Sequence, residues 1–230
     1  MKFSIIIPVH NEERFIIEVL KRVNEQKKIF DIEIIVSNDG STDETNKLLE
    51  ENKSLYDILV NSETNLGKGS AIKNGLEKAQ GDFTLIQDSD LEYNPNDYKN
   101  LFEPAINCKA DVVYGSRFIG GSYVRLHFFW HFLANKILTI MSNIFTNLNM
   151  SDMETGYKLI KTDILKKIDI QEKSFGIEPE LTLKLSKKKL KFYEVPISYE
   201  GRSYEEGKKI KFQDAFVAIY CIFKYGFFGK

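Results

Sequence analysis

Short apolar runs alternate with longer amphipathic segments through the first half of the chain. The apolar runs are rich in β-branched residues and do not alternate strictly, as expected for strands covered on both faces of a sheet. They predict strands at residues 3–9, 32–37, 57–60, 83–87 and 111–114. The segments between them predict helices at residues 13–24, 42–51, 68–78 and 96–107. This βα alternation predicts an α/β fold with a mostly parallel, Rossmann-like sheet and helices on both faces.

The pattern changes after Gly115. Residues 126–148 form a long apolar segment that is unusually rich in aromatic side chains, with Lys136 as its single charged residue, and residues 212–228 have the same character. Both segments predict amphipathic helices. Such a helix either packs its apolar face on the sheet or lies in a membrane interface, where aromatic side chains are favoured. The occurrence of two such segments favours membrane contact.

The composition is that of an ordinary globular protein. The 230 residues are 43% hydrophobic and 28% charged, and the net charge of −1 gives no overall attraction for nucleic acid. Cys108 and Cys221 lie far apart without a C-x-x-C partner, which favours a reduced, cytoplasmic chain. The first apolar run is too short for a signal peptide, and no run approaches the ~18 residues of a membrane span. Peripheral contact with a membrane stays open.

Acidic residues follow the predicted strand at residues 83–87. Asp88, Asp90 and Glu92 are spaced two apart, so in an extended segment their side chains point the same way. Ligands of open α/β sheets bind at the carboxyl ends of the strands. These carboxylates therefore predict a site for a hard divalent cation, which takes oxygen ligands and shares them with phosphates. A solvated turn is the alternative, because Asp and Ser are common in turns.

Polar residues also follow the first two predicted strands. Glu12 and Asp39 are expected in the same crevice, where a carboxylate can accept hydrogen bonds from the base or ribose of a nucleotide. Pro8 ends the first strand and Asn11 can cap the next helix, which needs no functional explanation. The segment Gly67-Lys68-Gly69 does not have the G-x-x-x-x-G-K-[ST] spacing of the phosphate loop of ATPases. Its lysine can still reach an anion.

Four motifs follow one another along the chain: Pro8-x-x-Asn11-Glu12, Asp39-Gly40-Ser41-x-Asp43, Asn65-x-Gly67-Lys68-Gly69 and Asp88-x-Asp90. Together they resemble the motifs of the GT-A inverting glycosyltransferases of family 2. Further segments are similar to the dolichyl-phosphate mannose synthase group, which transfers a sugar to polyprenyl phosphate. They are Gly115-Ser116-Arg117, residues 152–158, and Arg202 with Gly207-Lys208. The resemblance covers essentially the whole chain and implies one GT-A domain over residues 1–230, with amphipathic interface helices near residues 126–148 and 212–228.

The resemblance implies a donor-binding half at residues 1–117 and an acceptor-binding half at residues 118–230. The residues implied to bind the nucleotide sugar are Pro8, His10, Glu12, Asp39, Lys68, Asp88, Ser89, Asp90, Arg117, Arg202 and Lys208. Asp88, Asp90 and Glu92 would hold Mg²⁺ or Mn²⁺ against the diphosphate. Ser116, Arg117 and Arg125 would bind the acceptor phosphate, and Asp90, Arg117 and Asp152 would be the catalytic residues.

A lipid phosphate is already an anion near neutral pH, with a second pKa of ~6 by analogy with phosphorylated side chains. A strong general base is then dispensable, and fixed cations that position the phosphate become the main requirement. Asp152 and Glu154 are the candidates if a base is needed. A structural contact to Lys158 or to a helix terminus explains them equally well.

The expected function is metal-dependent, inverting transfer of a hexose from a GDP- or UDP-sugar to polyprenyl (dolichyl or undecaprenyl) phosphate at the cytoplasmic face of a membrane. Many similar proteins carry membrane-spanning helices after the catalytic domain. Without them, amphipathic segments or a membrane-anchoring partner protein are expected to provide the membrane contact. Asn38 and His10 depart from the family pattern, which leaves the base and the donor open. The alternatives are a soluble or polymeric glycan acceptor, or a non-catalytic nucleotide-binding module.

Overall fold

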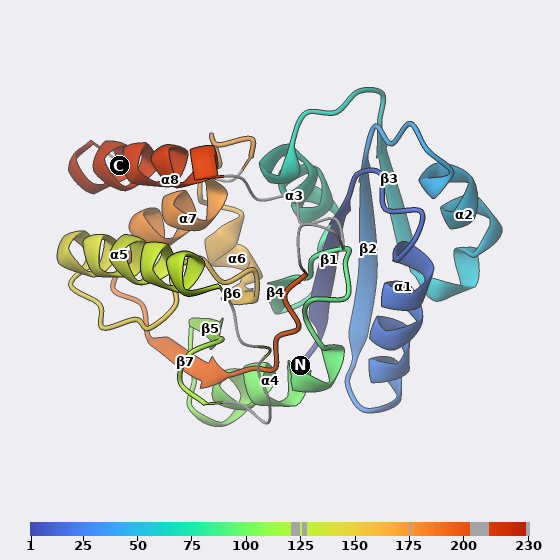
Figure 1. The fold of residues 1–230 in the computed structure, drawn as a ribbon. Coiled ribbons are helices and arrows are strands. Elements are labelled where there is room, and N and C mark those ends of the chain that lie inside the picture. The colour runs from blue at the N-terminus through green and yellow to red at the C-terminus, as the bar shows by residue number, and fades with distance from the viewer. Residues whose placement is uncertain (121–124, 126–127, 175, 203–211, 229–230) are drawn as a thin grey trace.

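A single sheet runs through the molecule (Figure 1). The computed structural model describes residues 1–230 except 121–124, 126–127, 175, 203–211 and 229–230. In these residues the sheet has seven strands in the order β3-β2-β1-β4-β6-β5-β7. The strands are β1 (Phe3–Val9), β2 (Ile32–Asp39), β3 (Ile58–Ser62), β4 (Phe83–Ile86), β5 (Val112–Ser116), β6 (Lys158–Lys161) and β7 (Phe192–Pro196).

The sheet is mostly parallel. β1 pairs in parallel with β2 and β4, β2 with β3, and β5 with β7. β6 lies between β4 and β5 and runs antiparallel to both. The carboxyl ends of the parallel strands and the amino end of β6 therefore meet at one edge of the sheet, where open α/β sheets bind ligands.

Helices cover both faces of the sheet because neighbouring residues of a strand point to opposite sides. In β1, Phe3 and Ile5 belong to one buried cluster with α1, α2 and α4, whereas Ile6 belongs to the other with α3 and α5–α8. The helices are α1 (Ile16–Glu25), α2 (Thr45–Glu51), α3 (Lys68–Lys78), α4 (Tyr98–Asn107), α5 (Phe129–Thr146), α6 (Thr162–Leu165), α7 (Ile177–Ser186) and α8 (Phe212–Phe227), with 3₁₀ turns at Gln26–Lys28, Lys53–Leu55 and Pro95–Asp97.

The predicted α/β fold class is confirmed, including all five strands and four helices of the first half. The sequence pattern did not predict β6, α6, α7 and β7. β6 has only four residues and carries lysine at both ends, and β7 is partly exposed at the edge of the sheet. Neither strand therefore shows the continuous apolar run that identified β1 to β5.

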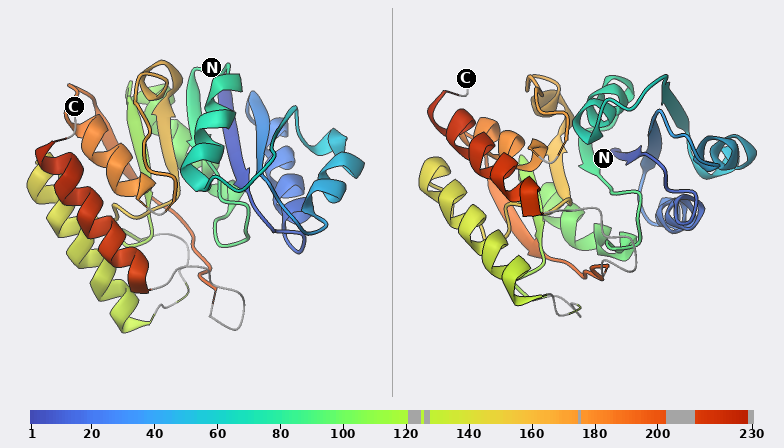
Figure 2. Two further views of the ribbon diagram at one scale, coloured as in Figure 1. Left: turned by 90° about the horizontal axis from the view of Figure 1, so that it is seen from above. Right: turned by 45° about the horizontal axis from the view of Figure 1, so that its top comes forward.

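The two aromatic segments form the helices α5 and α8, as predicted. They lie side by side on the outside of the molecule (Figure 2). Their inner sides bury Leu138 and Ile222, while their outer sides leave Trp130 73%, Ile144 74% and Phe227 67% exposed. Each helix thus packs on the body of the protein and also presents an apolar surface. Among the described residues, no helix has the length and apolarity needed to span a membrane.

The buried carboxylate of Glu33 joins β1 and β2 to the turn before β4. It accepts hydrogen bonds from Ser4 Oγ and from the Gln80 N–H, the latter at 2.5 Å, and forms an ion pair with Lys2 Nζ at 2.6 Å. Burial would raise the pKa of Glu33, but the hydrogen bonds from Lys2, Ser4 and Gln80 outweigh it and leave the pKa below its ordinary value of 4.5. The ionised form is therefore the one that stabilises this corner of the sheet.

Candidate active site

A cavity of about 320 Å³ opens at the carboxyl-end edge of the sheet. The ends of β1 and β2, the segments that follow β3, β4, β5 and β7, and the segment that precedes β6 all contribute residues to its lining. Segments far apart in the sequence therefore meet around one space. Of the residues predicted to form the site, those that line it are Pro8, His10, Glu12, Asp39, Lys68, Asp88, Ser89, Asp90, Glu92, Arg117 and Arg202.

Three predicted residues lie outside the lining of the cavity, and a fourth lies outside the described part of the chain. Asp152 and Ser116 are fully buried behind the cavity wall, whereas Arg125 is at the surface. The backbone N–H of Arg125 donates to the Tyr199 carbonyl at 3.0 Å, and its guanidinium donates to the Gly201 carbonyl at 3.1 Å. Lys208 is the residue outside the described part.

Asp39, at the end of β2, holds the loop that follows β3. Its Oδ1 accepts a hydrogen bond from the Leu66 N–H at 3.0 Å, and its Oδ2 accepts one from the Gly67 N–H at 2.6 Å. Gly67 has a φ of +97°, and a Cβ there would lie 2.1 Å from the Lys173 carbonyl oxygen, so only glycine fits. Both oxygens of Asp39 thus serve the wall of the cavity, and direct contact with a nucleotide stays a prediction.

Lys68 lies between two carboxylates inside the cavity. Its Nζ is 2.8 Å from Asp88 Oδ1 and 2.8 Å from Glu178 Oε1. Burial lowers the pKa of Lys68, but the charges of Asp88 and Glu178 raise it well above its ordinary value. The ammonium group is therefore charged and already paired with protein groups. The sequence predicts that Lys68 binds an anionic ligand, whereas in the structure its ammonium group binds two carboxylates of the protein. The second of them, Glu178, comes from the distant helix α7.

Asp90 and Glu92 share Arg202. The guanidinium Nη2 lies 2.6 Å from Asp90 Oδ2, and its Nε lies 3.2 Å from Glu92 Oε1. The Tyr199 hydroxyl donates a hydrogen bond to Glu92 Oε2 at 2.6 Å. Burial and the negative charges of Glu92 and Asp88 raise the pKa of Asp90 to about 7, although Arg202 opposes the shift. A further cation near Asp90 would therefore stabilise its ionised form.

The acidic lining of the cavity bears on metal binding. Among the described residues, no three acidic, histidine or cysteine side chains come close enough together to form a complete metal site. The expected convergence of Asp88, Asp90 and Glu92 on one ion is not met, because Asp88 pairs with Lys68 and the other two with Arg202. Yet one or two carboxylates plus phosphate oxygens suffice for Mg²⁺. Asp90 and Glu92 fit a site that a bound diphosphate completes.

The charge balance of the lining supports the same conclusion. The cavity is lined by seven acidic residues, Glu12, Asp39, Asp88, Asp90, Glu92, Glu154 and Glu178, and by three cationic ones, Lys68, Arg117 and Arg202. An anionic diphosphate entering such a cavity meets repulsion unless an additional cation accompanies it. The donor set consists of carboxylate oxygens, which Mg²⁺ and Mn²⁺ prefer.

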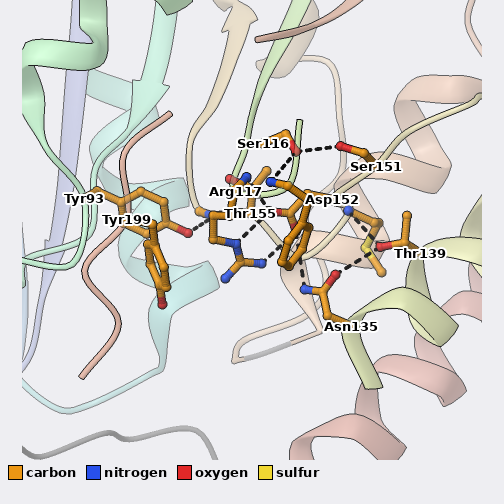
Figure 3. A network of polar contacts seen from close by, with 12 residues as sticks. Tyr93, Ser116, Arg117, Asn135, Thr139, Ser151, Asp152, Thr155 and Tyr199 are labelled. Atoms are coloured by element: carbon orange, nitrogen blue, oxygen red, sulfur yellow. Dashed lines mark hydrogen bonds and ion pairs between the residues drawn. The ribbon is translucent and has the colours of Figure 1, made fainter. Parts of the chain in front are cut away.

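Arg117 is fixed by a buried carboxylate (Figure 3). Its Nε lies 2.6 Å from Asp152 Oδ2, and its Nη2 lies 2.7 Å from Asp152 Oδ1, so the ion pair is bidentate. Burial raises the pKa of Asp152, but the charge of Arg117 outweighs it, and the net shift is downward. The ring of Tyr199 lies 5.0 Å from the guanidinium carbon. Asp152 therefore orients Arg117, and its burial and low pKa are unfavourable for a general base.

Hydrogen bonds hold the segment that carries Asp152. Asn135 of α5 donates to Asp152 Oδ1 at 3.3 Å, and Ser116 Oγ lies 2.5 Å from Ser151 Oγ (Figure 3). The carboxylate of Glu194 in β7 accepts from the backbone N–H groups of Ser151 and Asp152. Ser116 therefore supports the position of this segment, and its predicted contact with an acceptor phosphate stays a prediction.

Sequence reasoning did not identify Tyr93, Glu178 and Tyr199 as side chains of the cavity. The rings of Tyr93 and Tyr199 lie in tilted contact with their centroids 5.1 Å apart, and Glu178 pairs with Lys68. Tyr93 directly follows the predicted acidic motif, so its position in the sequence could have identified it as a residue of the site. Glu178 lies in α7 and Tyr199 follows β7, and both residues are far in sequence from the predicted site motifs. Only the folding of α7 and β7 onto the rest of the protein brings them to the cavity.

The sequence matches the family described as "Glycosyl transferase family 2" over residues 4–169. The chain therefore belongs to glycosyl transferase family 2, as its motifs predicted. It is 29% identical over 211 residues to the dolichol-phosphate mannosyltransferase of Pyrococcus furiosus, covering 90% of this chain and 59% of that protein. It is 31% identical over 221 residues to the uncharacterized protein MJ0544 of Methanocaldococcus jannaschii, covering 89% of this chain and 93% of that protein.

A further relative is the low-salt glycan biosynthesis hexosyltransferase Agl6 of Haloferax volcanii. The two chains are 29% identical over 209 residues, covering 88% of this chain and 48% of that protein. The chain thus spans about three-fifths of the length of the Pyrococcus protein and about half that of Agl6.

Solved structures confirm the GT-A fold. Glucosyl-3-phosphoglycerate synthase from Mycobacterium tuberculosis, in complex with Mn²⁺, UDP and phosphoglyceric acid, superposes with a TM-score of 0.73 at 18% identity, covering 98% of this chain and 78% of that chain. The same enzyme in complex with Mg²⁺ and UDP gives a TM-score of 0.69 at 17% identity, with 97% and 79% covered. At this level of identity the likeness concerns the fold.

Proposed function

We propose that this protein transfers a hexose from a nucleoside diphosphate sugar to a polyprenyl phosphate at a membrane surface. The observation that carries the proposal is the combination of an acidic cavity at the carboxyl ends of the strands with two helices whose outer sides are apolar. Membership of family 2 supports glycosyl transfer. The similarity to a dolichol-phosphate mannosyltransferase supports the polyprenyl phosphate acceptor.

The donor is proposed to lie along the edge of the sheet. Its base and ribose would occupy the end of the cavity near His10 and Glu12, which follow β1, and its diphosphate would lie by the segment from Asp88 to Glu92, which follows β4. His10 Nδ1 lies 2.9 Å from the Asp39 carbonyl, which ties the ends of β1 and β2 together. Both a GDP-sugar and a UDP-sugar agree with this arrangement.

Mg²⁺ or Mn²⁺ is the proposed cofactor, with Asp90 and Glu92 as its protein ligands. The complexes of the structurally similar mycobacterial enzyme with Mn²⁺ or Mg²⁺ and UDP support this choice. When bound, the ion would supply Lewis-acid stabilisation of the negative charge that develops on the departing diphosphate. Arg202 and Tyr199 hold the two carboxylates in place before any ligand arrives.

In the proposed step, an oxygen of the acceptor phosphate forms a bond to C1 of the hexose while the bond from C1 to the nucleoside diphosphate breaks. Attack from the side opposite the leaving group inverts the configuration at C1. With a second pKa of ~6, the acceptor phosphate reacts as an anion and loses no proton to the protein. Arg117, held by Asp152, is proposed to position this phosphate through its planar guanidinium.

The exposure of α5 and α8 favours a lipid acceptor over a soluble glycan. If the apolar sides of these helices were entirely core, the aromatic residues would have a purely structural explanation. Instead Phe129, Trp130 and Ile144 of α5 and Tyr220 of α8 are all more than half exposed. The N-terminal half of α5 also contacts the carboxylate that holds Arg117, because Asn135 donates to Asp152. A membrane against this surface would bring lipid headgroups close to Arg117.

Vesicle flotation tests the acceptor class. The full chain is expected to float with vesicles of phosphatidylcholine and phosphatidylglycerol. The variant Trp130→Gln/Ile144→Gln is expected to lose at least about 30-fold in binding, because each of the two apolar side chains contributes on the order of 1–3 kcal/mol when it is buried. Ile29→Gln is the matched control, since Ile29 is 70% exposed but follows α1 on the other side of the sheet.

The result decides between the acceptors. Loss of binding in the double variant with normal binding of the control supports contact through α5 and α8. A wild-type chain that stays at the bottom of the gradient would contradict the lipid acceptor and favour a soluble one.

A further inference from the structure

Glu154, one of the two candidate bases of the sequence analysis, lies in the cavity wall, and the proposed transfer step needs no base and does not use it. It precedes β6 in the segment that carries Asp152. Its side chain lines the cavity, yet one of its carboxyl oxygens, Oε1, is buried and has no hydrogen-bond partner among the described residues. A buried polar atom without a partner is unfavourable in a folded protein. Such an atom at a binding cavity calls for a functional explanation.

The backbone around Glu154 is held in place on both sides. The buried Lys158 donates hydrogen bonds from Nζ to the carbonyl oxygens of Met153, at 2.9 Å, and of Thr155. The Gly156 N–H donates to the Tyr93 hydroxyl oxygen at 2.7 Å, and a Cβ at Gly156 would lie only 2.4 Å from Asp88 Oδ2. This segment is thus packed directly against Asp88, and Glu154 is presented to the cavity by a fixed backbone.

The environment favours the neutral form of Glu154. Burial raises its pKa most, the charge of Glu178 on α7 raises it further, and the net value is about 8. Lys158 and Arg117 oppose the shift, and Asp152 adds to it. The cavity wall therefore favours the carboxylic acid form of Glu154, which can donate one hydrogen bond and accept others.

The order of strands along the edge places Glu154 beyond the diphosphate. Going from β1 to β4 to β6, the edge presents His10 and Glu12, then Asp88 to Glu92, then Glu154. Neighbouring strands are ~4.8 Å apart, so β6 lies roughly 10 Å from β1. That distance is of the order of the reach of a diphosphate. A donor that binds with its nucleoside at β1, as proposed, would have its sugar at β6.

We propose that Glu154 forms a hydrogen bond with a hydroxyl group of the hexose in the bound donor and contributes to the choice of sugar. The inference rests on the proposed function and deepens it. A hydroxyl group would complete the hydrogen bonding of the buried carboxyl oxygen. Sites that hydrogen-bond a substrate hydroxyl discriminate strongly against analogues that lack it, because the protein group is then left unpaired.

Calorimetric titration in the presence of Mn²⁺ tests the inference. The wild type is titrated with two pairs of ligands, UDP with UDP-glucose and GDP with GDP-mannose. The pair that it binds is then used for the variants. Glu154→Ala is expected to change the Kd of the nucleoside diphosphate by less than about twofold and to weaken the matching nucleotide sugar at least about tenfold. Glu154→Gln keeps the shape and both hydrogen-bonding functions, so it is expected to restore most of the sugar affinity. Glu77→Ala, an exposed change on α3, is the control.

The outcomes separate this inference from the proposed function. Equal weakening of nucleotide and nucleotide sugar by Glu154→Ala would overturn the sugar contact and indicate damage to the cavity wall. Unchanged binding of both would also overturn it, as would a Gln variant no better than Ala. A wild type that binds neither nucleotide would overturn the proposed function itself.

Discussion

Each cationic side chain in the cavity is held by carboxylates before any ligand is present. Lys68 lies between Asp88 and Glu178, Arg202 binds Asp90 and Glu92, and Arg117 forms a bidentate pair with Asp152. Fixed charges need no reorganisation when a substrate enters, which is a major way in which an enzyme lowers its barrier. The arrangement also leaves an excess of negative charge, so the residues themselves explain the need for a divalent ion.

Arg117 provides the sharpest test at this scale. Lysine keeps the charge but loses the planar fork, so Arg117→Lys breaks the bidentate pair with Asp152. We expect kcat/KM for sugar transfer to fall about 100-fold, or ~3 kcal/mol in the barrier. Arg22→Lys is the matched control, because Arg22 pairs with Glu18 on the exposed side of α1. A steady-state assay in which both variants retain wild-type activity would contradict the role of Arg117.

At the scale of elements, the site depends on one edge of the sheet being kept in register. The loops after β1, β2, β4, β5 and β7 and the segment before β6 all end at the cavity. Glu33 lies at the opposite edge of the sheet, near the start of β2, and it ties β1 and β2 to the turn that leads into β4. Loss of this contact should weaken the whole sheet without touching the cavity.

Glu33→Gln is therefore expected to lower stability and to leave the chemistry unaltered. Removing the carboxylate leaves the N–H of Gln80 and the buried N–H of Gly81 with a weaker acceptor, which should reduce the free energy of unfolding by about 1–3 kcal/mol at pH 7. Because the pKa of Glu33 is lowered in the folded state, its contribution is present above the ordinary value of 4.5 and is lost as the pH falls through the folded pKa.

Thermal unfolding of both proteins from pH 7 to pH 3 measures this effect. The difference in Tm between the wild type and Glu33→Gln should shrink as the pH falls from 4.5 through the lowered pKa of Glu33, since the wild-type side chain then becomes neutral as well. A constant difference over this range would show that the carboxylate charge does not stabilise the sheet.

At the scale of the whole molecule, the sequence predicted what depends on local pattern. The strands β1 to β5 and the helices between them have continuous apolar or amphipathic runs, and the residues at the strand ends follow from the topology of a parallel sheet. The resemblance to family 2 then identified most of the cavity, including Arg202 from the far end of the chain.

The remainder could not be read from the sequence because it depends on tertiary contacts. The pairing of Lys68 with Glu178 requires α7 to approach α3, and the sequence does not encode that approach as a pattern. Likewise, the spacing of Asp88, Asp90 and Glu92 suggests convergence, but Lys68 and Arg202 draw these side chains to different partners. The helices α5 and α8 are a further example. The pattern of apolar residues in their sequence cannot distinguish a side that packs on the protein from a side that is exposed.

Direct detection of the transfer product tests the central claim. The wild type is incubated with Mn²⁺, polyprenyl phosphate and a panel of GDP- and UDP-hexoses, and lipid extracts are examined by mass spectrometry. We predict a polyprenyl phosphate hexose from at least one donor and at least a 100-fold lower rate for Asp90→Asn, which removes a proposed metal ligand. No lipid-linked hexose from any donor, or full activity of Asp90→Asn with Mn²⁺ present, would contradict the account.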